Sequence, residues 1–138
     1  MDHISTAKFK KRFISLILGS RNLPKDRFSQ HILFISSILR FNPDRTYSEN
    51  EINHELKKWT GRFGVNFGLD HITLRRYIVD DKYLQRDPSG VHYQLNSSDL
   101  PYTYDPDIKA IDLKVLIQDA IKERECRKQQ YLRKSKEA

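Results

Sequence analysis

The chain has 138 residues, with 25 Lys and Arg against 18 Asp and Glu and a formal net charge of +7. A chain of this length suits one domain with a small appendage, and it can bury a core without disulfides or metals. The single cysteine, Cys126, excludes an internal disulfide and suits a reducing compartment. The apolar run from Phe13 to Leu18 is too short for a signal-peptide core or a membrane span. We therefore expect a cytoplasmic protein that does not enter membranes.

The positive charge is concentrated near both ends of the chain. Residues 1–22 hold five Lys and Arg against one acid, and residues 122–138 hold seven against three. The stretch 23–95 is nearly balanced, with eleven against nine. A local positive excess favours polyanionic partners, although it is also typical of solvated helix faces. The auxiliary cations that we expect to attract nucleic acid are Lys8, Lys10, Lys11, Arg12, Arg127, Lys128, Arg133 and Lys134.

Apolar residues at helical spacing predict two helices before residue 41. The first covers residues 5–19, and a basic amphipathic helix of this kind more often packs on its own domain than on a membrane. The second covers residues 25–40 and is the first core helix, ended by the turn-forming residues Asn42 and Pro43. The stripe residues are Phe9, Phe13, Leu16 and Ile17 in the first helix and Phe28, Ile32, Ile35, Ile38 and Leu39 in the second.

The most specific start signal for a helix is at Ser48. Ser48 and Glu51 have the spacing of a capping box, in which each side chain bonds the backbone N–H of the other residue. A further helix therefore begins here. Its buried stripe is Ile52, Leu56 and Trp59. Residues 45–47 form a short extended piece that we expect to pair with a later hairpin.

Residues 60–68 bring three glycines together with two phenylalanines. This density of glycine predicts a mobile loop rather than a tight turn. Phe63 and Phe67 are expected to fold back over the edge of the core, since isolated apolar residues near a core commonly do so. The alternative is that the two rings stack on bases or hold a partner.

Asp70 is a good N-cap for a third core helix, in which Leu74, Tyr77 and Ile78 share one face. The opposite face has the composition of a recognition helix, because arginine matches guanine bidentately in the major groove. The simpler alternative is a surface helix with two ordinary arginines. The candidate DNA-contacting residues of this helix are His71, Ile72, Thr73, Arg75 and Arg76.

A two-stranded ribbon follows, with strands at residues 83–86 and 91–95 and a turn at residues 87–90. Arg86 and His92 lie near its tip, where we expect them to contact phosphates or the minor groove. Helix, connection, helix and ribbon is the order of a winged helix-turn-helix. We therefore predict a mostly helical α+β fold, with a winged helix-turn-helix core and extra N- and C-terminal helices.

Four segments follow from these predicted elements. The first is an N-terminal basic amphipathic helix, and the second is the winged-helix-like domain. A polar, proline-containing linker leads to a C-terminal amphipathic helix with a basic tail, which Asp112 caps. We expect the stripe of this last helix to dock on the first helix or to pair two chains as a homodimer. The segments are residues 1–22, 23–95, 96–111 and 112–138.

Residues with catalytic or metal-binding potential are not arranged for either purpose. No glycine-rich nucleotide motif follows a strand, and no nucleophile elbow is present. The five histidines lack acidic or cysteine companions at ligand spacing, so we expect them at the surface or at helix edges. We expect no enzyme activity, no cofactor and no metal.

Four motifs within residues 21–95 resemble a known family. They are Arg21-Asn22-Leu23-Pro24-Lys25, Tyr47-Ser48-Glu49-Asn50-Glu51-Ile52-Asn53, Asp70-His71 with Leu74-Arg75-Arg76-Tyr77-Ile78-Val79-Asp80, and Tyr83-Leu84-Gln85-Arg86 followed by Gly90 and Tyr93. In this order they are similar to an uncharacterised bacterial domain family whose members stand alone or are attached to helix-turn-helix transcriptional regulators. The resemblance implies a winged-helix-like fold and a regulatory setting, without a known ligand or target.

The favoured function is binding of double-stranded DNA by a transcriptional regulator or accessory factor. The alternative is a protein-interaction module without sequence-specific DNA binding, because the nearly balanced charge of residues 23–95 is weak for a nucleic-acid face. RNA binding through Phe63, Phe67 and the basic tails is a third hypothesis. A steep loss of affinity with salt would mark phosphate contacts.

Overall fold

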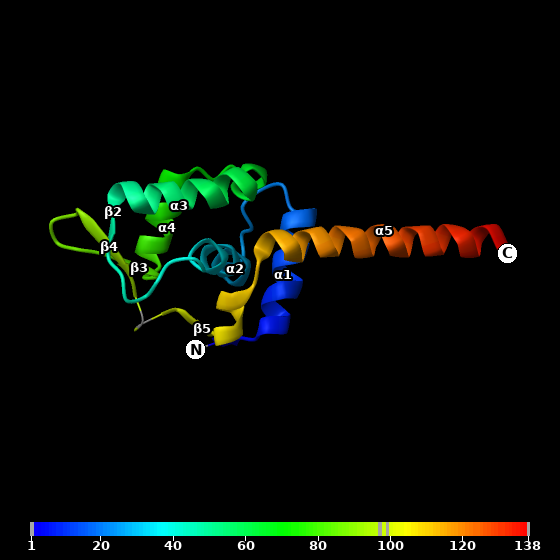
Figure 1. Cartoon of the computed structure of the whole chain (residues 1–138), viewed down its shortest axis with the longest axis horizontal. Coiled ribbons are helices and arrows are strands. Elements are labelled where there is room, and N and C mark those ends of the chain that lie inside the picture. Colours follow the sequence, from blue (N-terminus) through cyan, green and yellow to red (C-terminus); the bar gives the residue numbers. More distant parts are fainter. Residues whose placement is uncertain (1, 97, 99, 138) are drawn as a thin grey trace.

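The computed structural model describes residues 2–96, 98 and 100–137, so the ends of the predicted segments at residues 1 and 138 lie outside the described residues. Residues 97 and 99 of the predicted linker also lie outside them. The fold is mostly helical α+β, as predicted (Figure 1). Its elements are β1 (Asp2–Ile4), α1 (Thr6–Gly19), α2 (Arg27–Ser37), β2 (Tyr47–Ser48), α3 (Glu49–Arg62), the 3-10 turn η1 (Gly64–Phe67), α4 (His71–Asp80), β3 (Leu84–Arg86), β4 (His92–Leu95), β5 (Tyr102–Tyr104), the 3-10 turn η2 (Pro106–Ala110) and α5 (Leu113–Glu137).

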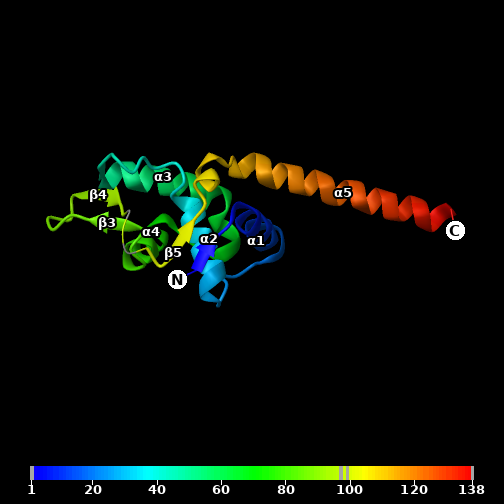
Figure 2. The ribbon, with the colours of Figure 1, turned by 90° about the horizontal axis from the view of Figure 1, so that it is seen from below.

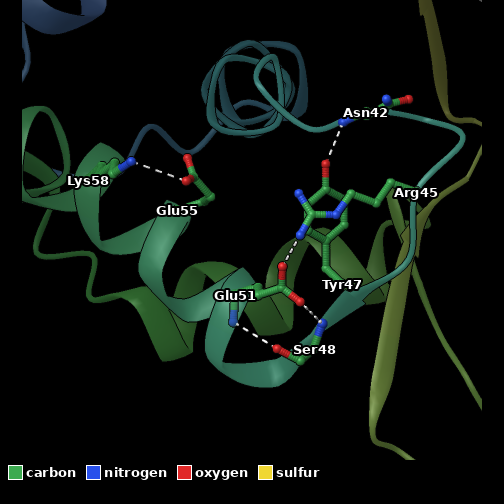
Figure 3. Close-up of polar contacts among 7 residues, drawn as sticks. All are labelled: Asn42, Arg45, Tyr47, Ser48, Glu51, Glu55 and Lys58. Atoms are coloured by element: carbon green, nitrogen blue, oxygen red, sulfur yellow. Dashed lines mark hydrogen bonds and ion pairs between the residues drawn. The ribbon is translucent and has the colours of Figure 1, made fainter.

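Short-range caps define the starts of the helices. The predicted capping box of α3 is present: Ser48 N donates to Glu51 Oε1 at 3.1 Å, and Glu51 N donates to Ser48 Oγ at 3.2 Å (Figure 3). The bond from the Ser48 N–H lowers the pKa of the Glu51 carboxyl. Asp70 caps α4 in the same way, accepting from Thr73 N at 2.7 Å. These two helices therefore begin where their sequence signals predict.

The helix predicted over residues 25–40 is shorter than expected. Asp26 accepts from Ser29 N at 2.9 Å and so fixes the first helical residue of α2 as Arg27. At the other end, the backbone of Ile38 leaves the helical region, and residues 38–40 form a turn. The apolar stripe continues through this turn, because Ile38 and Leu39 are still buried. Burial, and not helicity, explains the apolar periodicity there.

The predicted pairing of residue 47 with the ribbon is confirmed. Strands β2, β4 and β3 form an antiparallel sheet in that order, with Tyr47 opposite Tyr93 and Arg86 opposite Tyr93. The OH of Tyr47 also accepts from Asn42 N at 2.7 Å, which holds the segment leading into β2 (Figure 3). The strand that precedes α3 is therefore joined to the hairpin that follows α4.

The segment predicted as a linker, residues 96–111, holds two ordered elements. Strand β5 pairs in parallel with β1, so that residues about 100 positions apart in the sequence are neighbours. The turn η2 then places Ile108 in the core, and Ile111 is also buried. Polar composition and prolines suggested a linker, but these two isoleucines and the β1 partner tie the segment to the body of the protein.

The stretch predicted as a mobile loop, residues 60–68, is a helix end followed by a 3-10 turn. Helix α3 continues to Arg62, and Phe63 and Phe67 are both buried, as favoured. Gly64 is needed for this path, because a Cβ there would lie 2.9 Å from the Leu69 carbonyl oxygen. Gly68 ends the turn with a φ of 65°, in the left-handed region that glycine favours. The glycines therefore permit a compact corner.

Helix α1 and the first turns of α5 complete the core. Phe9 and Phe13 of α1 are fully buried, and α1 contacts both α2 and α5. Ile117 and Ala120 of α5 are buried as well. From Ile121 to Ser135, every side chain of α5 is exposed, and this part of the helix projects away from the body (Figures 1 and 2). Docking of α5 on α1 is thus confirmed for the first turns of α5, up to Ala120.

One histidine differs from the expectation of surface or helix-edge positions. His31 is fully buried, and its Nδ1 lies 2.5 Å from the OH of Tyr83. Burial lowers the pKa of this imidazole. Its ring also lies against Phe34 and Tyr102, with ring centroids 5.7 and 4.7 Å away. Within the described residues, no helix is long and apolar enough to cross a membrane.

Candidate nucleic-acid interface

Helix α4 and the β3–β4 hairpin are held together by buried aromatic and aliphatic side chains. Leu74 and Ile78 point from α4 into the core and are fully buried. Tyr83 and Tyr93, from the two sides of the hairpin, are buried with them. The opposite face of α4 lies beside the hairpin. Helix α4 and the hairpin are at the same end of the molecule (Figure 1).

A groove with a volume of about 300 Å³ lies between α4 and the hairpin. Four predicted DNA-contacting residues line it: three belong to α4, and one comes from β3. We call this surface the α4–hairpin groove. Its residues are Ile72, Arg75, Arg76, Val79, Asp80, Arg86 and Tyr93.

The two arginines of α4 have different surroundings. Arg75 Nη1 donates to Asn53 Oδ1 at 2.7 Å and to Glu49 Oε1 at 3.1 Å, and the Arg75 side chain is 19% exposed. Arg76 is exposed, and among the described residues it makes no hydrogen bond or ion pair. Arg75 therefore connects α4 to α3, whereas Arg76 has its guanidinium available for another molecule.

The hairpin tip is ordered by Asp87. Its carboxylate accepts from Val91 N at 2.9 Å and from His92 N at 3.2 Å, and these bonds lower its pKa to about 2. The His92 ring lies beside the same carboxylate, with Nδ1 3.3 Å from Oδ2. Arg86 Nε donates to the Gly90 carbonyl at 3.3 Å. The tip is therefore held by hydrogen bonds to one carboxylate, and the Arg86 side chain lies against Gly90.

Three predicted contact residues lie outside the groove. His71 and Thr73 are half-buried at the start of α4, and His92 is on the hairpin strand β4. Helical spacing places Val79 on the same face of α4 as Ile72 and Arg76, and Val79 does line the groove. Sequence reasoning missed two groove residues, Asp80 and Tyr93. Asp80 follows Arg76 by four positions, so helical spacing could have found it. Asp80 matters because it adds a negative charge to the C-terminal side of the groove.

The auxiliary cations are distributed over two other surfaces. Lys8 and Arg12 of α1 lie over the Phe28 ring, 4.9 and 5.6 Å from its centroid. Lys10 and Lys11 are exposed on the same helix. The remaining four are on the projecting part of α5, beyond Ala120, at the end of the molecule opposite the hairpin (Figures 1 and 2). They are Arg127, which pairs with Glu123, and Lys128, Arg133 and Lys134.

In the part of the chain that the structure describes, no group of three or more His, Cys, Asp and Glu side chains is placed to hold a metal ion. Cys126 is exposed on α5, away from the groove. The expectations of no enzyme activity and no cofactor stay predictions.

The fold and the groove define a small α+β protein. The segment from just before α2 to the end of β4 matches a known family. The chain belongs to the bacterial family described as "uncharacterized protein conserved in bacteria" (DUF2087), whose model matches residues 21–95. No curated protein and no solved structure shows a significant match. The matched segment contains the α4–hairpin groove, whereas α1, β5 and α5 lie outside it.

Proposed function

We propose that this protein binds double-stranded DNA in the cytoplasm as a transcriptional regulator or accessory factor. In this proposal, α2, α3 and α4 with the β2–β4–β3 sheet form a winged helix-turn-helix, in which α4 is the recognition helix and the hairpin is the wing. The element order and the sheet order support it. The sequence resemblance implies that some family members are attached to helix-turn-helix transcriptional regulators, and such an arrangement would fit a regulatory role.

The observation that carries the proposal is the position of Arg76 and Arg86 on the two walls of one groove. An arginine on the exposed face of α4 can match the O6 and N7 of guanine in the major groove. An arginine on the hairpin can meet the adjacent backbone or minor groove. Arg75 then has a positioning role, because its bonds to α3 fix the orientation of α4.

The charge of the groove constrains how a duplex would lie. Asp80 is at the C-terminal end of α4 and would repel phosphates there. The Asp70 carboxylate caps the other end of α4 and is also negative. Arg76, the sixth of the ten residues of α4, lies between the two acids, so in this proposal the face from Ile72 to Arg76 would enter the major groove.

Selection of bound genomic duplexes on the purified protein, followed by affinity measurements at several salt concentrations, tests this proposal. For the preferred duplex, Arg76→Ala is expected to lower affinity by about 1–3 kcal/mol. Lys57→Ala, which removes an exposed charge from α3 outside the groove, is the matched control and should change it little. Equal affinity of wild type and Arg76→Ala for every selected duplex would refute the proposal.

A protein-interaction module is the second candidate, and one observation favours it. Ile72 is 53% exposed on the face of α4 that would meet DNA, and Val79, about two turns further along α4, also lines the groove. A contact of this kind would show little salt dependence, in contrast to phosphate contacts. Phe63 and Phe67, the two rings that RNA binding would use for base stacking, are only 6% and 5% exposed, so their burial does not support such stacking.

A homodimer through the terminal helices stays a prediction. The stripe of α1 is already used inside the chain, since Phe9 and Phe13 are buried. The pairing surface would therefore be the projecting part of α5, where three apolar side chains are exposed. They are Ile121, Tyr131 and Leu132.

A further inference from the structure

A pocket of about 260 Å³ lies where the C-terminal end of α2, the second half of α3 and the first turn of α5 meet. It is separate from the α4–hairpin groove, and the two share no lining residue. The volume is just below the roughly 300–1,000 Å³ usual for drug-sized ligands, so the pocket suits a small molecule. We call it the Trp59 pocket.

The inner wall of the Trp59 pocket is apolar and offers no free hydrogen-bond donor. Trp59 and Phe63 are each 6% exposed and lie with ring centroids 5.9 Å apart. Trp59 Nε1 donates to Ser36 Oγ at 2.9 Å, and the hydroxyls of Ser36 and Ser37 donate to backbone carbonyls at 2.6 Å. A ligand would therefore meet this wall with an apolar ring or chain.

The rim of the pocket is predominantly basic. Four cations lie on it against two acids. One acid, Glu55, pairs with Lys58 at 3.2 Å (Figure 3). The other, Asp112, is engaged by Val115 N at 3.2 Å as the cap of α5. The cations are Arg40, Lys58, Arg62 and Lys114.

Two of these cations are available to a ligand. Arg40 Nη2 donates to the Ile111 carbonyl at 2.7 Å, which joins α2 to the start of α5. Arg62 and Lys114 make no hydrogen bond or ion pair within the described part of the chain. They extend from the last turn of α3 and the first turn of α5, on two sides of the same opening.

We propose that the Trp59 pocket binds a small amphipathic anion, an organic acid with an apolar ring or chain. The apolar part would rest on Trp59 and Phe63, and the acid group would lie between Arg62 and Lys114. Charge complementarity favours this occupant, because the pocket has both an apolar wall without free polar groups and unpaired cations at its rim. The site does not depend on DNA binding, and it lies at the end of α3 opposite the residues that hold Arg75.

The protein contains a single tryptophan, so its fluorescence reports on this pocket. The experiment titrates the full-length protein with 8-anilinonaphthalene-1-sulfonate and with N-phenyl-1-naphthylamine, which has the same rings without the sulfonate. Tryptophan quenching and probe emission are followed together. The sulfonate is expected to quench Trp59 and to bind at least about fivefold more tightly than the neutral probe.

The double variant Arg62→Gln, Lys114→Gln is expected to weaken binding of the sulfonate about fivefold and to leave binding of the neutral probe unchanged. The matched control is Lys57→Gln, Lys128→Gln, which removes the same charge outside the pocket. Near-ultraviolet circular dichroism checks that all proteins have the same packing.

Several outcomes would overturn the proposal. The sulfonate could bind no better than the neutral probe, or it could bind without changing the tryptophan emission. The two double variants could also lose affinity equally, which would mark a general charge effect. The comparison of the two probes on the wild-type protein decides the question even if a variant does not fold.

Discussion

Arg75 of α4 donates a hydrogen bond to Asn53 of α3, with 2.7 Å between Nη1 and Oδ1. The neighbouring Arg76 points to solvent from the same helix. Two adjacent arginines that look equivalent in the sequence therefore have separate roles, one within the protein and one available to a partner. Mutating them separately distinguishes stability from binding.

Replacing Arg75 by alanine is expected to lower the free energy of unfolding by about 1–2 kcal/mol, because a charged group loses hydrogen bonds to two partners. Arg76→Ala is expected to change it by less than about 0.5 kcal/mol, as surface substitutions commonly do. Urea denaturation measures both. If Arg75→Ala and Arg76→Ala destabilise the protein equally, then the contact of Arg75 with α3 makes no specific contribution to stability.

Gly64→Ala is expected to destabilise the protein by about 1–3 kcal/mol, because the new Cβ would lie 2.9 Å from the Leu69 carbonyl oxygen and 3.0 Å from Thr60 Cβ. Gly61→Ala is the matched control. A Cβ at Gly61, inside α3, has nothing within 4 Å, so alanine should stabilise the helix by up to about 1 kcal/mol. Thermal unfolding measures the midpoint temperature of both variants. A shift of the same sign in both would contradict the expected crowding at Gly64.

Stability should fall as the pH is lowered from 7 to about 5.5, in part because of His31. Burial is the largest cause of its lowered pKa, and Asp81 opposes this effect while Arg27 adds to it. Because the His31 pKa is lower in the folded state, the unfolded state binds more protons than the folded state does below about pH 6.5. The protein then loses stability as the pH falls through this range.

His31→Gln removes this titration, so the free energy of unfolding should depend less on pH between 7 and 5.5. His54→Gln, at an exposed position on α3, should keep the wild-type dependence. Urea denaturation at several pH values gives the slopes. If His31→Gln and wild type have the same slope, then His31 does not contribute to the loss of stability in acid.

Removing residues 122–138 should leave the core intact, because every described side chain from Ile121 to Ser135 is exposed. The deletion removes seven Lys and Arg with three Glu. If the basic tail contacts DNA, affinity should fall and the salt dependence should become less steep. Replacing Arg127, Lys128, Arg133 and Lys134 by glutamine keeps the helix and isolates the charge. An unchanged salt slope in both proteins would exclude a tail contact.

Local features were the most predictable from sequence. The capping box at Ser48 and the Asx cap at Asp70 each depend on residues three positions apart, so both could be identified without tertiary information. Helix stripes follow from spacing, and the buried apolar residues of α1, α3 and α4 belong to the predicted faces, although Tyr77 of α4 is 37% exposed. Family membership followed from the motif order within residues 21–95.

Features that depend on distant residues were harder to predict. The burial of His31 requires Tyr83 as a hydrogen-bond partner, and those residues are 52 positions apart. The bond between Arg75 and Asn53 depends on how two helices pack, which helical periodicity does not specify. Likewise, residues 96–111 look like a linker until the β1 strand supplies a partner for β5.

The pairing of β1 with β5 has a consequence for the order in which the chain can fold during synthesis. The hairpin and the helices of residues 21–95 have partners within that segment, and these contacts can form as soon as the segment has emerged. Strand β1 must wait about 100 residues for its neighbour, since His3 is opposite Thr103. Until then, the apolar face of α1 lacks the cover of η2 and α5. A ribosome that stalls before β5 would therefore present residues 21–95 with an N-terminal helix that has α2 as a partner but lacks η2 and α5.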